Sequence, residues 1–284
     1  MTTEDRQPPV GGLSDGPVEI RPQNLEKAFD DHRVLCGIDL EIRQGEVVAI
    51  VGGSGCGKTV LLNHILGQLE PDAGHVRVAD YQQPGAPVVD LADLDDLETD
   101  AVHLHWGVVF QRNALFSGSV FDNILLWLKE VKNLDEDDVM PIAQEVLAAV
   151  ALPVDDAFLD TDTESLSGGM AKRLAIARAL SMTPNVIFYD EPTTGLDPTS
   201  AAQVQDLIME THGPRRDSQT ARTSVIITHD KDLLCRLHPR IVMIFEGRIV
   251  FDGPFRDFEA SHSPITRPYF ELMPVLHQRE AGSG

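Results

Sequence analysis

The sequence predicts an α/β fold in which helices cover a mainly parallel β-sheet. Four apolar runs support this prediction, because each has the near-continuous apolar character of a strand buried on both faces: EVVAIV (46–51), VIFYDEP (186–192), SVIITHD (224–230) and RIVMIF (240–245). Each run is followed by a turn or a helical stretch, and this alternation is typical of layered α/β proteins. A chain of 284 residues with 42% hydrophobic residues is large enough to bury such a core.

The segments around these runs divide the chain into one domain and two terminal extensions. Residues 18–42 alternate apolar and polar positions, which indicates short antiparallel strands, and residues 59–69 form an apolar helical stretch. Residues 80–100 are acidic and contain prolines, which indicates a loop or an edge insertion, whereas residues 111–180 look mainly helical and 212–223 look like a polar surface loop. We expect a disordered lead-in at 1–17, a domain at 18–253 with a helical subdomain at about 112–180, and a C-terminal tail at 254–284.

Composition and charge limit which partners the protein can bind and in which cellular compartment it is expected. The formal net charge of −22 argues against nucleic-acid binding, which needs basic patches, and against a polybasic membrane anchor. No apolar run approaches the ~20 residues of a membrane span, and the N-terminal residues lack the pattern of a signal peptide. The three cysteines share no metal or redox spacing. These observations predict a cytoplasmic, reduced protein whose membrane role, if it has one, comes through a partner.

The strongest single motif is GGSGCGKT at 52–59, which fits G-x-x-x-x-G-K-[ST] between a buried strand and a helix. Glycines let backbone N–H groups turn toward phosphate oxygens, and the helix N-terminus adds partial positive charge. Lys58 is expected to reach the terminal phosphates and the Thr59 hydroxyl to ligate Mg²⁺, whereas Cys56 has no chemistry of its own. The alternative is a plain glycine turn. The expected phosphate cradle consists of Gly52, Gly53, Ser54, Gly55, Cys56, Gly57, Lys58 and Thr59.

Two carboxylates follow the strand VIFYDE at 186–191. Asp190 is expected to hold Mg²⁺ directly or through a water, and Glu191 to act as the general base on the attacking water. The alternative is an acidic strand end that caps a helix.

A glycine-rich stretch, LSGGM at 166–170, opens a long helical run ahead of this Asp-Glu pair. Gln111 stands in VVFQRNALF, TGLD lies at 194–197, and His229 stands in IITHD. Together with the phosphate loop, these motifs resemble the set of the ATP-binding cassette (ABC) ATPases: Q-loop glutamine, signature, D-loop and switch histidine, in that order. The D-loop departs from the usual pattern because Gly195 replaces Ala. The resemblance runs from about residue 18 to residue 253.

This resemblance implies a P-loop NTPase fold with a RecA-like core, an N-terminal antiparallel β subdomain and a helical signature subdomain. It also implies that two copies pack head to tail with two ATP molecules between them. Ser167, Gly168 and Gly169 of one copy would then face the γ-phosphate bound by the other, and Asp197 would reach across the dimer. The alternatives are ordinary helix caps at Ser167 and Asp197.

The remaining assignments also rest on the resemblance. His229 is expected to sense the γ-phosphate, and Gln111 to contact the metal and the water while coupling ATP to a partner. Phe29 occupies the place of the aromatic residue that stacks on adenine, usually Tyr. A structural histidine and a core phenylalanine are the competing interpretations. Arg178 and the other basic residues of the signature helix are interpreted as a solvated face.

Short segments suggest which cassette this is. The stretch after Gln111, Met170 in place of the usual Gln, and the tail PITRPYFE resemble the Mla/Mce type, which drives lipid trafficking in the bacterial envelope. This type implies several partners: a second copy, an integral membrane permease, a substrate-binding or Mce-type lipid-binding protein and a small regulatory subunit. It also places the chain on the cytoplasmic face of the inner membrane, with a tail that can reach a neighbouring subunit.

Two alternatives stay open. One is the ATPase subunit of an amino-acid or other small-solute importer. The other is a soluble ABC ATPase that never meets a membrane and acts on ribosomes, DNA repair or iron–sulfur assembly. The single cassette, the lack of a sustained heptad run and the acidic charge all disfavour the second alternative.

Overall fold

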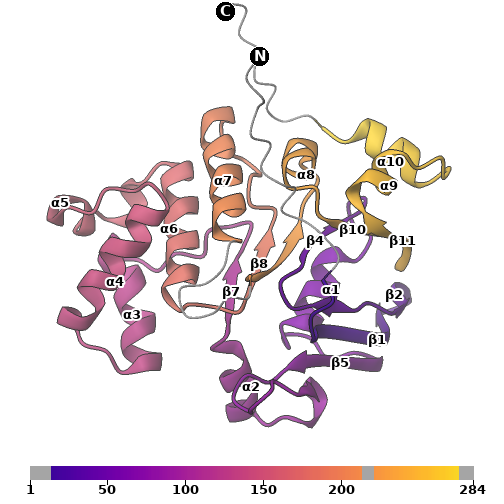
Figure 1. Ribbon diagram of the computed structural model, residues 1–284, viewed down its shortest axis with the longest axis horizontal. Helices are drawn as coiled ribbons and strands as arrows, with labels where there is room; N and C mark the ends of the chain where they lie inside the picture. Colours follow the sequence, from indigo (N-terminus) through magenta and orange to yellow (C-terminus); the bar gives the residue numbers. More distant parts are fainter. Residues whose placement is uncertain (1–13, 213–220, 275–284) are drawn as a thin grey trace, which may run out of the picture.

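The computed structural model describes residues 14–212 and 221–274. The expected lead-in therefore lies outside the described residues except for 14–17, and so do most of the expected loop at 212–223 and the end of the tail. Two sheets and the helices packed around them make up the described part (Figure 1). No helix in it is long and apolar enough to cross a membrane.

A six-stranded, mainly parallel sheet forms the centre, as the apolar runs predict. Its order is β11-β10-β4-β9-β8-β7, in which all neighbours are parallel except the edge pair β10–β11. Strands β4, β8 and β9 are buried at every position, which explains their continuous apolar sequence. The strands are β4 (Val47–Val51), β7 (Trp106–Val109), β8 (Val186–Asp190), β9 (Thr223–Ile227), β10 (Arg240–Phe245) and β11 (Arg248–Pro254).

The N-terminal sheet is antiparallel, as expected, but its first element is longer than predicted. Strand β1 is one continuous 12-residue strand rather than several short ones, and it pairs with β2, β3 and β5. Its pairings with β2 and β5 contain register shifts of the kind that β-bulges produce. The strands are β1 (Val18–Phe29), β2 (His32–Ile38), β3 (Ile42–Arg43), β5 (Ala73–Ala79) and the edge strand β6 (Val88–Asp90).

Residues 80–100 are more ordered than a loop, because they contain β6, a short 3-10 turn (Leu91–Asp93) and the start of α2 (Asp96–His103). Helix α2 is capped by Asp95, whose side chain accepts from the Glu98 N–H in a reciprocal capping box. Helix α1 (Lys58–Ile65) ends before the predicted limit of residue 69, and Gly67 beyond it has a positive φ of 67°. The apolar side of α1 joins both sheets in one core.

The expected helical subdomain is present and lies beside β7 at one side of the molecule (Figure 1). Its helices share a second core with α7 and the opposite face of the central sheet. They are α3 (Val120–Lys132), α4 (Glu136–Ala149), α5 (Asp156–Leu159) and α6 (Gly168–Ser181), with a 3-10 turn at Thr163–Ser165. The other helices of the sheet region are α7 (Pro198–Thr211) and α8 (Lys231–Leu237).

The first two-thirds of the expected tail belong to the folded domain. Residues 254–274 form α9 (Phe255–Glu259) and α10 (Thr266–Leu272), which bury Phe255, Phe258 and Phe270 against β4 and β10. Aromatic edge-to-face contacts link these three rings at centroid distances of 5.6 and 6.1 Å. Burying large aromatic area is a strong driving force, so the chain from 254 to 274 is held on its own sheet.

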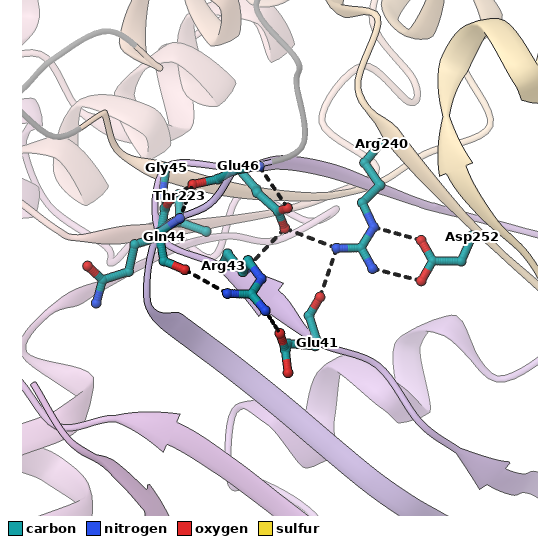
Figure 2. Close-up of polar contacts among 10 residues, drawn as sticks. Glu41, Arg43, Gln44, Gly45, Glu46, Thr223, Arg240 and Asp252 are labelled. Carbon is teal, nitrogen blue, oxygen red and sulfur yellow. Dashed lines mark hydrogen bonds and ion pairs between the residues drawn. The ribbon is translucent and has the colours of Figure 1, made fainter.

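A buried ionic network joins the ends of β3, β4, β10 and β11 (Figure 2). The Glu46 carboxylate is 1% exposed and accepts hydrogen bonds from the N–H groups of Ser14 and Arg43 and from Arg240 Nη1 at 3.1 Å. The Arg240 guanidinium also donates two hydrogen bonds, of 2.6 and 2.7 Å, to the Asp252 carboxylate. Removing one member of such a buried pair costs about 3–5 kcal/mol. This network anchors the N-terminal sheet to the central sheet.

Candidate nucleotide-binding site

The glycine loop follows the buried strand β4 and leads into α1, as predicted. A side chain at Gly52 would collide with the Ile244 carbonyl oxygen and lie 2.6 Å from Cys56 Sγ, so the loop leaves the sheet through a space that only glycine fits. Lys58 folds back over this loop and donates to the carbonyl oxygens of Gly52 at 2.8 Å and Gly53 at 3.1 Å. The ammonium group therefore lies at the cradle itself.

The N-terminus of α1 is open to an anion. Its cap residue, Gly57, makes no side-chain cap hydrogen bond, and the first turn contains no acidic residue. In contrast, Ser167 and Asp197 cap α6 and α7 with their own side chains. Uncapped N–H groups and the helix dipole together favour phosphate oxygens. The loop and the start of α1 can therefore hold a polyphosphate.

The other groups stand at the same edge of the sheet. The loop follows β4, His229 follows β9, Asp190 and Glu191 end β8, and Gln111 follows β7. These four strands are consecutive neighbours in the sheet and run parallel, and ligands of open α/β sheets bind at the carboxyl ends of the strands. The fold therefore brings five sequence-predicted groups from four distant segments to one edge.

Glu191 and His229 form a pair at this edge. His229 Nδ1 lies 2.7 Å from Glu191 Oε2, which also accepts from the Thr194 hydroxyl at 3.2 Å. Glu191 has a φ of 47°, an uncommon left-handed conformation that costs roughly 1–2 kcal/mol. Its N–H still pairs with the Ile227 carbonyl oxygen, so the chain turns only after the strand pairing is complete. The neighbouring carboxyl of Asp190 is 9% exposed, and burial together with the charge of Glu191 raises its pKa.

Sequence reasoning missed Asp230, which links these two loops. Asp230 is fully buried, and its Oδ2 accepts from the Thr193 hydroxyl and the Gln205 side-chain amide, both at 2.8 Å. Its Oδ1 accepts from the N–H of Leu233 at 3.2 Å at the start of α8. The carboxylate thereby holds the segment after His229 against the segment after Glu191. The sequence did offer one signal for this residue, because Asp230 directly follows the motif residue His229 after a buried strand.

The signature helix corrects the interpretation of its basic residues as a solvated face. Lys172 is 2% exposed, and its ammonium donates to the carbonyl oxygens of Phe110 at 2.8 Å and Gln111 at 2.9 Å. Burial lowers the pKa of Lys172 to about 8. Arg178 is half-buried and donates to the Ala114 carbonyl oxygen at 2.8 Å. Lys172 and Arg178 therefore hold the backbone around Gln111, a segment that is neither helix nor strand.

The two signature glycines differ in their surroundings. A Cβ at Gly169 would lie 2.7 Å from Ser200 Cβ on α7, so packing within the chain requires glycine at this position. A Cβ at Gly168 would meet only Leu196 Cδ2, at an ordinary 3.8 Å. Ser167 caps α6 by accepting from the Met170 N–H at 3.3 Å, and Asp197 caps α7 through the N–H groups of Thr199 and Ser200. Ser167 and Asp197 therefore do cap their helices. The roles of these residues and of Gly168 across a dimer stay predictions.

Phe29 is not a core residue. Its ring is 43% exposed at the end of β1, with Lys27 Nζ 5.7 Å from the ring centroid. A cavity of about 350 Å³ adjoins the glycine loop. It is lined by residues 32–34 after the β1–β2 turn, residues 53–56 of the loop and residues 245–247 of the β10–β11 turn. The phosphate loop therefore opens on one side to a space large enough for part of a nucleoside.

The residues present fit a magnesium ion with a nucleotide. Thr59 offers an exposed hydroxyl at the start of α1, and Asp190 offers a carboxylate at the end of β8. Mg²⁺ takes hard oxygen ligands and is usually held by one or two protein groups together with substrate phosphates. No group of three or more His, Cys, Asp or Glu side chains suited to a metal occurs in 14–212 and 221–274. Thr59 and Asp190 are the protein groups that would hold the ion beside the phosphates.

The fold and this edge define a P-loop nucleotide hydrolase. Residues 35–194 match the family described as "ABC transporter", and the chain belongs to that family. The chain is 37% identical to the L-cystine transport system ATP-binding protein TcyN of Escherichia coli, covering 89% of this chain and 97% of that protein. It is 32% identical to Protein TRIGALACTOSYLDIACYLGLYCEROL 3 of Arabidopsis thaliana (90% and 74%). It is 33% identical to the intermembrane phospholipid transport system ATP-binding protein MlaF of Haemophilus influenzae (82% and 83%).

Solved structures agree with this membership. The cbiO1 structure from Clostridium perfringens, described as part of the ABC transporter complex cbiONQ, superposes with a TM-score of 0.71 at 30% identity, covering 86% of this chain and 91% of that one. The dimeric cassette MJ0796 bound to ADP and Pi superposes with a TM-score of 0.70 at 27% identity (84% and 99%). The chain is thus an ABC ATPase that couples ATP hydrolysis to transport.

Proposed function

We propose that this ATPase energises a permease for phospholipid or other lipid trafficking in a bacterial envelope, in the manner of the Mla/Mce systems. The observation that carries this proposal is the similarity to MlaF, whose name states intermembrane phospholipid transport, over 82% of the chain. An Mce-type lipid-binding protein and a small regulatory subunit would complete the assembly on the cytoplasmic face of the inner membrane. The second candidate is an amino-acid importer subunit, which the 37% identity to TcyN favours.

Within the site, we assign roles by position. Lys58 and the loop N–H groups bind the phosphates of ATP, and Thr59 and Asp190 hold Mg²⁺, which supplies charge neutralisation when bound. Glu191 accepts the proton of the attacking water, while His229, 2.7 Å from it, contacts the γ-phosphate. Phe29 stacks on the base, and Gln111 reports to the permease. The accessible Gly168 meets the nucleotide of the second copy.

An apolar groove beside Gln111 is where we place the permease. A cavity of about 430 Å³ lies between residues 66–68 after α1, β7, α3 and α6, and its lining includes Phe110, Phe116 and Trp127. The side chains of Phe116 and Trp127 remain 43% and 42% exposed. Because Lys172 binds the carbonyl oxygens of both Phe110 and Gln111, a permease segment in this groove would contact the same backbone that leads to the nucleotide. Apolar grooves with large exposed aromatic residues are typical of protein interfaces.

Purification from detergent-solubilised membranes tests the proposal. We expect this chain to co-purify with an integral membrane permease and bound phospholipid. A permease with a solute-binding protein and no lipid would favour the importer, and ribosomes or nucleic acid would overturn the transport assignment. Trp127→Glu should break the association with the permease while ATP binding persists. Leu97→Glu, at a 79% exposed position on α2 that does not line the groove, is the matched control.

A further inference from the structure

The C-terminal helix α10 contacts the phosphate loop through one hydroxyl group. Tyr269 Oη accepts a hydrogen bond from the Gly52 N–H at 2.9 Å, and it donates to the Gly52 carbonyl oxygen at 3.2 Å. These residues are 217 positions apart in the chain. A segment that follows the last strand therefore pairs with both backbone groups of the first glycine in the cradle.

Helix α10 is held firmly at this place. Lys231, two residues after His229, donates to the Phe270 carbonyl oxygen at 3.2 Å and stands 4.0 Å from the centroid of the Phe270 ring. The Phe270 ring is 8% exposed and packs against Phe255 and Phe258. Packing of this kind fixes the side-chain rotamers on either side of it. The Tyr269 hydroxyl is thus positioned by the core and by the segment that follows His229.

The Gly52 carbonyl oxygen has two hydrogen-bond donors, Tyr269 and Lys58. Gly52 is buried, and a buried carbonyl left without a partner costs about 1–3 kcal/mol. We expect Lys58 to leave this carbonyl oxygen when it turns to nucleotide phosphates. We propose that Tyr269 is a positioning residue of the nucleotide site, whose hydroxyl keeps Gly52 paired when Lys58 moves to the phosphates. This inference rests on the proposed phosphate role of Lys58.

The chemistry of the hydroxyl agrees with this role. Burial raises the pKa of Tyr269 to about 12, so the group keeps the proton it donates at neutral pH. Phenylalanine would preserve the ring packing of α10 and remove only the hydroxyl, which isolates the hydrogen bond from the rest of the helix.

ATP titration by calorimetry tests the inference, with Tyr269→Phe compared with the wild type. We expect ATP affinity to fall about three- to tenfold, which is the equivalent of one hydrogen bond. The matched control is Tyr189→Phe, because the buried Tyr189 hydroxyl bonds to Thr211 Oγ1 at 3.1 Å, on α7 and away from the glycine loop. That variant should bind ATP like the wild type. Equal affinity of Tyr269→Phe and the wild type, or an equal loss in both variants, would overturn the inference.

A second variant covers the case in which Tyr269→Phe does not fold. Lys231→Met removes the contacts that hold Phe270 and leaves the Tyr269 hydroxyl in place. It should also weaken ATP binding, and unchanged affinity in this variant would count against the role of α10. The proposed phosphate role is tested separately by Lys58→Ala, which should abolish most ATP binding whether or not Tyr269 contributes.

Discussion

The Glu191 carboxylate oxygen Oε2 lies 2.7 Å from His229 Nδ1, within hydrogen-bond distance. This contact joins the ends of strands β8 and β9 beside the glycine loop. The pair places a carboxylate and an imidazole together at the position where the γ-phosphate of ATP is expected. An imidazole bonded through Nδ1 presents its Nε2 to a ligand. The geometry therefore supports separate roles for the two groups, with Glu191 on the water and His229 on the phosphate.

Glu191→Gln should nearly abolish turnover while ATP binding is kept. The amide preserves the shape of the side chain but cannot accept the proton of the attacking water, and loss of general-base catalysis costs about 10²–10⁴-fold. The variant should accumulate an ATP-bound dimer, which size-exclusion chromatography with MgATP would reveal. Wild-type turnover in this variant would show that another group is the base.

Gly168 and Gly169 should respond differently to substitution. Gly168→Asp has room within its own chain, since a Cβ there meets only Leu196 Cδ2 at 3.8 Å. It should fold and bind ATP as a monomer but fail to form the closed dimer. Gly169→Ala should instead lower the melting temperature, because its methyl group would press on Ser200. A Gly168→Asp variant that dimerises and hydrolyses ATP normally would contradict the role of the signature across the dimer.

Lys172→Met should impair coupling as well as stability. It removes two hydrogen bonds from the ammonium to the carbonyl oxygens of Phe110 and Gln111, and a hydrogen bond to a charged group contributes about 1.5–3 kcal/mol. We expect a lower urea midpoint and a loss of permease-stimulated ATPase activity that exceeds the loss of basal activity. The control is Lys129→Met, which changes an exposed lysine on α3. An equal loss of stimulated and basal activity would assign Lys172 a purely structural role.

His212 should make the folded state sensitive to mild acid. The side chain is 7% exposed, and this burial lowers its pKa from the usual 6.5 to about 4. Between pH 6.5 and pH 4 the unfolded chain binds a proton that the folded chain does not, so the free energy of unfolding falls as the pH falls through this window. The contribution is at most ~3 kcal/mol. Urea unfolding at pH 7 and pH 5 measures the part that falls between these two values, about 2 kcal/mol.

The variant His212→Gln cannot take up this proton, so its stability should change less between the two pH values. His262→Gln, at an exposed position, should retain the pH dependence of the wild type. If His212→Gln and the wild type lose the same free energy on acidification, another group is responsible.

Local patterns in the sequence were sufficient for four of the six strands of the central sheet, β4, β8, β9 and β10, and for the motif residues. A strand buried on both faces needs a continuous apolar run, and a phosphate loop needs glycines followed by Lys58 and Thr59, so both features are visible without any knowledge of contacts. The family resemblance on ordered motifs then predicted the nucleotide, the second copy and the membrane partner. Motifs of the ATPase do not distinguish cargo, because a cystine-transport relative and a phospholipid-transport relative match the chain at 37% and 33% identity.

Only the tertiary structure determined which long-range contacts support the site. Lys172 looks like any lysine on a helix and Tyr269 like part of a tail, since nothing in the sequence near them shows that they are buried. Asp230 stands beside a motif histidine, but the sequence does not show which groups its carboxylate meets. Each acts on backbone or side-chain groups from a distant segment: Lys172 on Gln111, Asp230 on Thr193 and Tyr269 on Gly52. Such contacts depend on how helices dock on the sheet. Local periodicity reports which face of an element is buried, but not which partner it meets there.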